Sequence, residues 1–211
     1  MRFYGIEKIK YLVILPLTFS KISKECFEEE LEVFKIIAEN FIDLPITFYI
    51  KPKPLSNFIT INDFPKNCIL GYDDGDSNVN KKLLIDHDYS NYRAFIIKKA
   101  KLILNIGTTF VLDASFAKTN ILQLKISNKK NWHNLTESCK NYHQEQYLYT
   151  KDNFFDIRSK DDLKKINIEK YIYNKNKLNP ATEKLNQWLT EPLKDRVKIS
   201  QVITENLNIN K

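Results

Sequence analysis

The segment from Lys99 to Leu124 constrains the fold most strongly, because its pattern is that of a strand, a tight turn, a helix and a second strand. Apolar runs at 102–104 and 121–124 are typical of strands in a parallel sheet that is covered on both faces. Between these runs, Gly107 ends the first strand and two threonines open the helix. A β–α–β unit of this kind predicts a parallel sheet with a right-handed crossover.

The rest of the chain repeats this alternation of strands and helices. The predicted strands are 11–17, 46–50, 68–70, 82–85, 102–104, 121–124 and 154–157, and the predicted helices are 24–40, 92–100, 110–117, 160–166, 180–190 and 192–207. The stretch 125–146 is polar, with Trp132 inside it, and 167–178 is predicted as an exposed connection. We therefore predict an α/β fold with a Rossmann-like parallel sheet flanked by helices. Residues 1–10 are a lead-in, 11–178 form the domain, and 179–211 add C-terminal helices that pack on it.

The turn after the strand at 102–104 is the first candidate binding site. Gly107 followed by Thr108 and Thr109 at a helix start leaves backbone N–H groups unpaired, at the positive end of the helix dipole. Such an end suits a phosphate group. Asp113 lies one turn into the helix, where its carboxylate can accept hydrogen bonds from hydroxyl groups of the same ligand. The alternative interpretation is an ordinary strand-to-helix turn.

Two further loops follow predicted strands and add candidate contacts. Lys51 and Lys53 alternate with two prolines directly after the strand at 46–50, at the edge where open α/β sheets bind ligands. His87 lies in the loop after the strand at 82–85. A solvated turn with incidental lysines, and a structural loop histidine, are the alternatives.

Composition narrows the classes of partner. The formal net charge is +7, but only four residues are arginine, and the many Lys, Asn and Ile residues are typical of an AT-rich coding sequence. A basic surface could otherwise attract polyanions, including anionic lipid at a membrane face. Nucleic-acid proteins depend on arginine for bidentate contacts, so we predict no nucleic-acid partner.

No metal or targeting signal stands out. Three scattered cysteines predict reduced thiols, and His133, Cys139 and His143 match no common zinc module. The acidic residues at 25–32 fit the first turns of a helix better than a metal site. Pro16 interrupts the first apolar run and no small-residue cleavage site follows, so we expect a cytoplasmic protein without a signal peptide. Peripheral association with the inner membrane face is the alternative location.

Several segments, in order, resemble the C-terminal, donor-binding half of a GT-B fold glycosyltransferase. The resemblance is closest to bacterial surface-polysaccharide and CDP-glycerol transferase-like proteins. The segments that carry it are YLVILPL with the acidic helix after it, ITFYIKPKP, AFIIKKAKLILNIGTTFVLDASFAKTNILQL, DNFFDIRSKDDLKKI and EPLKDRVKISQVI. It implies that Gly107, Thr108 and Thr109 contact the donor phosphates and that Asp113 holds the ribose. Lys53 stands where the family often has a phosphate-contacting histidine.

The resemblance also implies an incomplete enzyme. A GT-B glycosyltransferase has two halves, and its catalytic base usually comes from the acceptor half, so no catalytic residue is assigned here. The implied activity is a metal-independent transfer from a nucleotide-sugar donor, with no cofactor, in polysaccharide synthesis together with a separate acceptor-binding chain or domain. The sequence departs from the family at Lys101, at 118–120 and at 195–196. The alternatives are a non-catalytic scaffold or partner that keeps the fold, and a sugar-nucleotide epimerase-like protein.

Overall fold

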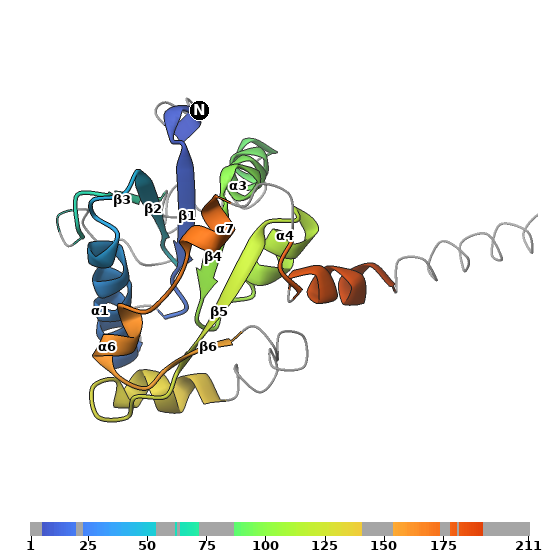
Figure 1. Ribbon diagram of the computed structural model, residues 1–211. Coiled ribbons are helices and arrows are strands. Elements are labelled where there is room, and N and C mark those ends of the chain that lie inside the picture. Colours follow the sequence, from blue (N-terminus) through green and yellow to red (C-terminus); the bar gives the residue numbers. More distant parts are fainter. Residues whose placement is uncertain are drawn as a thin grey trace, which may run out of the picture.

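The protein is an α/β domain built on a six-stranded sheet in which all neighbouring strands are parallel (Figure 1). The computed structural model describes residues 6–19, 23–53, 62, 64–71, 87–140, 154–173, 178–180 and 182–191. The strand order is β3-β2-β1-β4-β5-β6, the order of a doubly wound Rossmann sheet. The strands are β1 Tyr11–Pro16, β2 Ile46–Lys51, β3 Cys68–Leu70, β4 Leu102–Asn105, β5 Asn120–Ile126 and β6 Phe154–Ile157.

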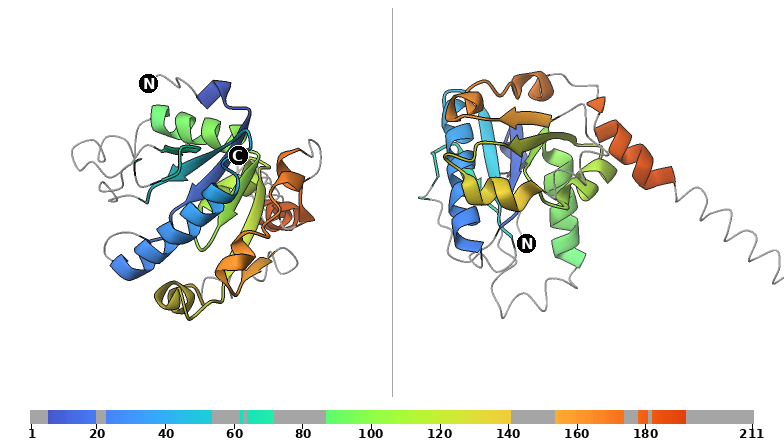
Figure 2. Two further views of the ribbon diagram at one scale, coloured as in Figure 1. Left: turned by 60° about the vertical axis from the view of Figure 1, so that its left-hand side comes forward. Right: turned by 90° about the horizontal axis from the view of Figure 1, so that it is seen from below.

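Helices lie on both sides of the sheet (Figure 2). The labelled elements are η1 Ile6–Lys8, α1 Lys24–Asn40, α3 His87–Lys99, α4 Phe110–Phe116, α6 Lys160–Leu163 and α7 Glu169–Ile172, and residues 133–140 and 182–191 are also helical. In β1, Val13 and Leu15 face α1, α6, α7 and the 133–140 helix, whereas Leu12 and Ile14 face α3, α4 and the 182–191 helix. This alternation along a fully buried strand produces two hydrophobic cores, one on each face.

The predicted α/β class and parallel sheet are confirmed, and the connection predicted at 167–178 is wrong. The polar stretch 125–146 contains a helix at 133–140, and Trp132 before it is fully buried. The segment 167–178 contains α7, which buries Ile168, Tyr171 and Ile172 because they recur at helical spacing. Helix α3 begins at His87, earlier than predicted. The strand predicted at 82–85 and the helix predicted at 192–207 lie outside the described residues.

The acidic residues of α1 form specific hydrogen bonds. Glu29 accepts hydrogen bonds from the backbone N–H groups of Asn134 and Leu135, at 3.4 and 2.7 Å, at the start of the 133–140 helix. Glu32 accepts the indole N–H of Trp132 at 2.8 Å. These carboxylates tie the second layer of helices to α1, and the described residues contain no group of three metal-ligating side chains.

The 182–191 helix is anchored to β5. The Asn179 side chain donates to the carbonyl of Ile121 at 2.6 Å, and the Thr182 hydroxyl accepts the N–H of the same residue at 2.9 Å. Asn179 also caps this helix by accepting the N–H of Thr182 at 2.8 Å. Both backbone groups of Ile121 are therefore satisfied by the C-terminal segment, before β5 begins to pair with β6 at Gln123.

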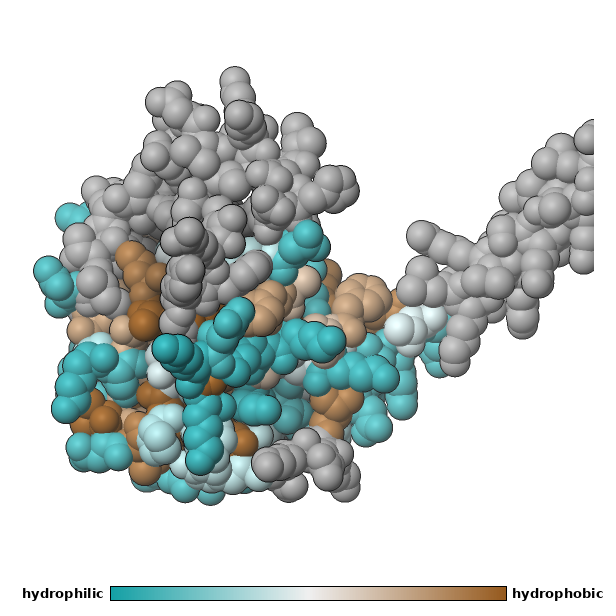
Figure 3. All heavy atoms as spheres, turned by 90° about the horizontal axis from the view of Figure 1, so that it is seen from above, coloured by the Kyte–Doolittle hydropathy of each residue, from teal (hydrophilic) through white to brown (hydrophobic). Residues whose placement is uncertain are grey.

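On the face seen from above, hydrophilic side chains cover much of the described surface (Figure 3). In a view from above, the hydrophobic side chains form small separate areas among hydrophilic ones (Figure 3). The exposed large hydrophobic residues are Leu112, Phe116, Tyr173 and Trp188. Within the described part of the chain, no helix has the length and apolar character needed to cross a bilayer.

Candidate functional site

The strand order places a topological switch point between β1 and β4. The chain runs outward from β1 to β2 and β3 on one side, and from β4 to β5 and β6 on the other. Open α/β sheets bind ligands at the carboxyl ends of the two strands that flank such a point, because their loops diverge there and leave a crevice. Here those loops begin at Leu17 and at Ile106.

The loop after β4 is the Gly107 turn predicted from the sequence. Gly107 is buried, and the next two residues lie closer to the surface. The N–H of Thr108 donates to the Asn105 side chain at 3.1 Å, and the Thr108 hydroxyl accepts the N–H of Phe110 at 2.8 Å, at the start of α4. The hydroxyl keeps its own proton, so it can still donate to a ligand.

Two buried amides hold this turn in place. The Asn105 side chain donates to Gln123 on the neighbouring strand at 2.7 Å, and Gln123 donates to the carbonyl of Ile106 at 2.8 Å. The two residues are register partners across β4 and β5. They were not predicted as site residues, although the sequence carries a signal: one amide ends the apolar run of β4, and another interrupts the apolar run in the middle of β5.

The loop after β1 is held by a buried carboxylate. Glu30 on α1 is fully buried and accepts the backbone N–H of Thr18 at 2.8 Å and that of Phe19 at 3.0 Å. Lys53 donates to the carbonyl of Thr18 at 3.0 Å. Burial raises the pKa of Glu30 to about 7, while the backbone hydrogen bonds and the positive charge of Lys53 oppose that rise.

Two cations meet at the first residue of α4. The Nζ of Lys51 lies 5.4 Å from the centre of the Phe110 ring, and the guanidinium carbon of Arg93 lies 5.3 Å from it. Lys51 is the last residue of β2 and Arg93 belongs to α3, so these two elements and α4 converge beside the turn after β4. Cations at these distances interact favourably with the aromatic ring.

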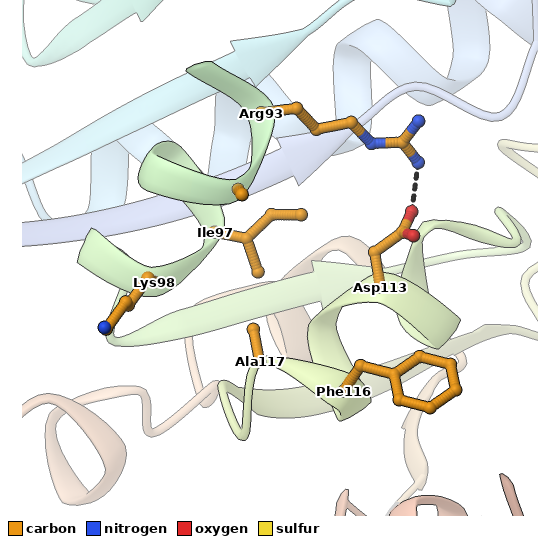
Figure 4. A pocket seen from close by; sticks show the side chains of 7 residues that line it. Arg93, Ile97, Lys98, Asp113, Phe116 and Ala117 are labelled. Carbon is orange, nitrogen blue, oxygen red and sulfur yellow. Dashed lines mark hydrogen bonds and ion pairs between the residues drawn. The ribbon is translucent and has the colours of Figure 1, made fainter. Parts of the chain in front are cut away.

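Arg93 also forms an ion pair with Asp113, which links α3 to α4 (Figure 4). The two side chains point toward one another at one end of a groove of about 480 Å³ between the helices. Ile97 projects from α3 into the groove, whereas Lys98 and Phe116 direct their side chains away from its centre. Asp113 is therefore already engaged by a residue that the sequence reasoning did not select.

The predicted site residues divide into two groups. The turn at 107–109, Asp113 and Lys51 lie around Phe110, whereas Lys53 contacts the loop after β1. His87 is the first residue of α3 rather than part of a loop, and its side chain is outside the description. The sequence reasoning did not select four further residues of the site, which are Arg93, Asn105, Gln123 and Glu30.

This arrangement provides hydrogen-bond donors and positive charge at the carboxyl edge of the sheet, which suits an anionic ligand. The first turn, after β1, contains no glycine, so it lacks the Gly-x-Gly-x-x-Gly pattern of dinucleotide-binding Rossmann domains. The sequence matches no protein-family model, and no curated protein is similar to it at a significant level. The function is therefore argued from the geometry of the site.

Proposed function

We propose that this chain binds a nucleotide-diphosphate donor at the switch point between β1 and β4. The observation that carries the proposal is the convergence of the Gly107 turn, Lys51 and Asp113 at this one point of the sheet. Diphosphate oxygens need hydrogen-bond donors and positive charge, and ribose hydroxyls need an acceptor such as a carboxylate. The site contains both kinds of group within about one helical turn of each other.

The wider role proposed is that of the donor-binding module of a glycosyltransferase, or of a glycerophosphotransferase-like enzyme, in surface polysaccharide synthesis. The chemistry would be displacement at the donor, with the leaving diphosphate stabilised by the Thr108 hydroxyl and the nearby lysines rather than by a metal ion. The acceptor and the catalytic base would come from a second chain or domain. A basic surface supports docking of that assembly on anionic lipid.

One observation favours a second candidate, a non-catalytic scaffold that keeps the fold. Three predicted ligand contacts already have internal partners: the Thr108 hydroxyl accepts the N–H of Phe110, Lys53 holds the loop after β1, and Asp113 pairs with Arg93. A scaffold would use these groups for stability alone. A donor-binding site requires them to exchange or share partners when the ligand arrives.

Saturation-transfer NMR with UDP, CDP and GDP separates the two candidates. Donor binding predicts saturation transfer from the protein to at least one of these nucleotides. Calorimetry should then show that a Thr108→Val, Lys51→Gln double variant binds it at least about tenfold more weakly, because both a hydroxyl donor and a positive charge beside the turn are lost. Lys164→Gln is the matched control, because it removes an exposed lysine directly after α6, on the opposite face of the sheet. If no saturation transfer is seen to any of the three nucleotides, the scaffold is supported. If the double variant binds a nucleotide with unchanged affinity, this site is refuted.

A further inference from the structure

Arg93 lies in an environment that satisfies only part of its hydrogen-bonding capacity. Its Nε–H group is buried and has no hydrogen-bond partner among the described residues. One terminal nitrogen donates to Asp113, and the side chain is 39% exposed, so solvent or a ligand can reach it. A guanidinium has five donors in a planar fork, and a buried donor without a partner costs free energy that an added acceptor recovers.

The surroundings of Arg93 favour an anion as that acceptor. Lys51 approaches the same Phe110 ring, so two positive charges lie beside the Gly107 turn, and Asp113 neutralises only one charge there. An anion with several oxygens could accept from the Nε–H and from a terminal nitrogen together, in the bidentate geometry that guanidinium groups prefer. A single carboxylate held on α4 contacts one terminal nitrogen only.

We propose that Arg93 is the principal anion ligand of this site, and that Asp113 is an internal counter-ion which an incoming diphosphate displaces. Displacement frees the Asp113 carboxylate at the same moment that Arg93 turns to the phosphates. Asp113 can then accept hydrogen bonds from ribose hydroxyls, so one exchange of partners prepares both contacts. The identity of the anion as part of a nucleotide rests on the function proposed above, whereas the anion site itself does not.

Inorganic pyrophosphate is the appropriate probe, because it has no ribose and therefore reports on the phosphate contacts alone. Calorimetry at low ionic strength should compare the wild-type protein with Asp113→Asn, Arg93→Gln and the double variant. Asp113→Asn releases Arg93 and removes a negative charge beside the anion, so affinity should rise about three- to tenfold. Arg93→Gln should lower affinity by at least as much, and the double variant should resemble Arg93→Gln.

Two surface variants control for net charge, since a basic protein attracts any polyanion. Asp161→Asn and Lys164→Gln make the same charge changes at an exposed ion pair between α6 and the residue directly after it. They should leave pyrophosphate affinity within about twofold of wild type. Arg93→Lys keeps the charge without the planar fork and should bind with intermediate affinity. The proposal is overturned if Asp113→Asn does not exceed wild type, or if Asp161→Asn raises affinity equally.

Parallel titrations with UDP, CDP and GDP distinguish failure of this inference from failure of the proposed function. If the variants bind pyrophosphate in the predicted order of affinity but no nucleotide binds more tightly than pyrophosphate, the anion site is supported and the nucleotide function is refuted. If a nucleotide binds more tightly than pyrophosphate, but the wild-type protein and its three Arg93 and Asp113 variants bind pyrophosphate with equal affinity, the nucleotide function is supported and the role of Arg93 is refuted. Circular dichroism of each variant checks that the α3–α4 pair remains folded.

Discussion

Replacing Glu30 by glutamine should change the way stability depends on pH. Glu30 is fully buried, and its carboxylate accepts the N–H groups of Thr18 and Phe19. Burial raises its pKa from an ordinary 4.5 to about 7. Glutamine has nearly the same shape and keeps one carbonyl oxygen as an acceptor, but it cannot ionise.

The direction of the effect follows from the two pKa values. Because the pKa in the folded protein is the higher one, the folded state holds the proton at pH values where the unfolded chain has released it. The contribution of Glu30 to stability is therefore complete below pH 4.5 and is lost as the pH rises through 7. The interval between the two values corresponds to about 3 kcal/mol, of which roughly 2 kcal/mol falls between pH 5 and pH 8.

Urea denaturation, followed by circular dichroism at pH 5, 6, 7 and 8, measures this difference. The free energy of unfolding of the wild-type protein should fall by about 2 kcal/mol more than that of Glu30→Gln across the range. Contributions from other titrating groups cancel in the comparison. Glu25→Gln, at an exposed position of the same helix, removes the same charge and should follow the wild-type curve.

A parallel pair of curves for wild type and Glu30→Gln would refute the reasoning. It would mean that the backbone hydrogen bonds and Lys53 compensate burial completely, so that the carboxyl is ionised in the fold at little cost. Lys53→Met provides a second test of the same reasoning. Loss of its positive charge should make the fall in stability between pH 5 and pH 8 steeper.

Two further predictions concern the buried amides and the C-terminal anchor. Gln123→Leu leaves Asn105 and the carbonyl of Ile106 without this partner, so the free energy of unfolding in urea should fall by about 2 kcal/mol. Pyrophosphate affinity should also weaken, although Gln123 does not touch the ligand, and unchanged affinity would contradict a positioning role. Thr182→Val removes the acceptor of the buried Ile121 N–H, so it should lower the free energy of unfolding by about 1–3 kcal/mol in the same measurement. Thr190→Val, later in that helix, should change the free energy of unfolding by no more than about 0.5 kcal/mol, and equal losses of stability in the two variants would contradict the anchor.

Much of the fold could be predicted because its elements carry strong local patterns. The boundaries of α1 follow from apolar residues at helical spacing, and the strands follow from short apolar runs. The strand order could not be read in the same way, because the neighbour of β1 on its second side, β4, lies far along the chain. The helix at 133–140 was missed because its start is capped by Glu29, a residue of another element.

The candidate site was predictable at the level of one loop and not at the level of its contacts. Gly107 and the threonines after it indicate a turn, and this signal can be read from the sequence alone. The ion pair between Arg93 and Asp113 exists only because α3 and α4 pack side by side, which is a property of tertiary structure. Helix α7 is different, because the spacing of Ile168, Tyr171 and Ile172 was readable but lay within a stretch rich in lysine and asparagine.

The anchor between the C-terminal segment and β5 has a consequence for the order in which the protein is made. Ile121 belongs to β5, the second strand from the centre of the sheet, but its backbone groups that face away from β4 are completed only by Asn179 and Thr182. A nascent chain that ends before these residues presents an unpaired stretch of strand to its neighbours, as an exposed sheet edge does. Translation must therefore proceed some sixty residues past Ile121 before this part of β5 is protected, and until then the incomplete strand can pair with another chain.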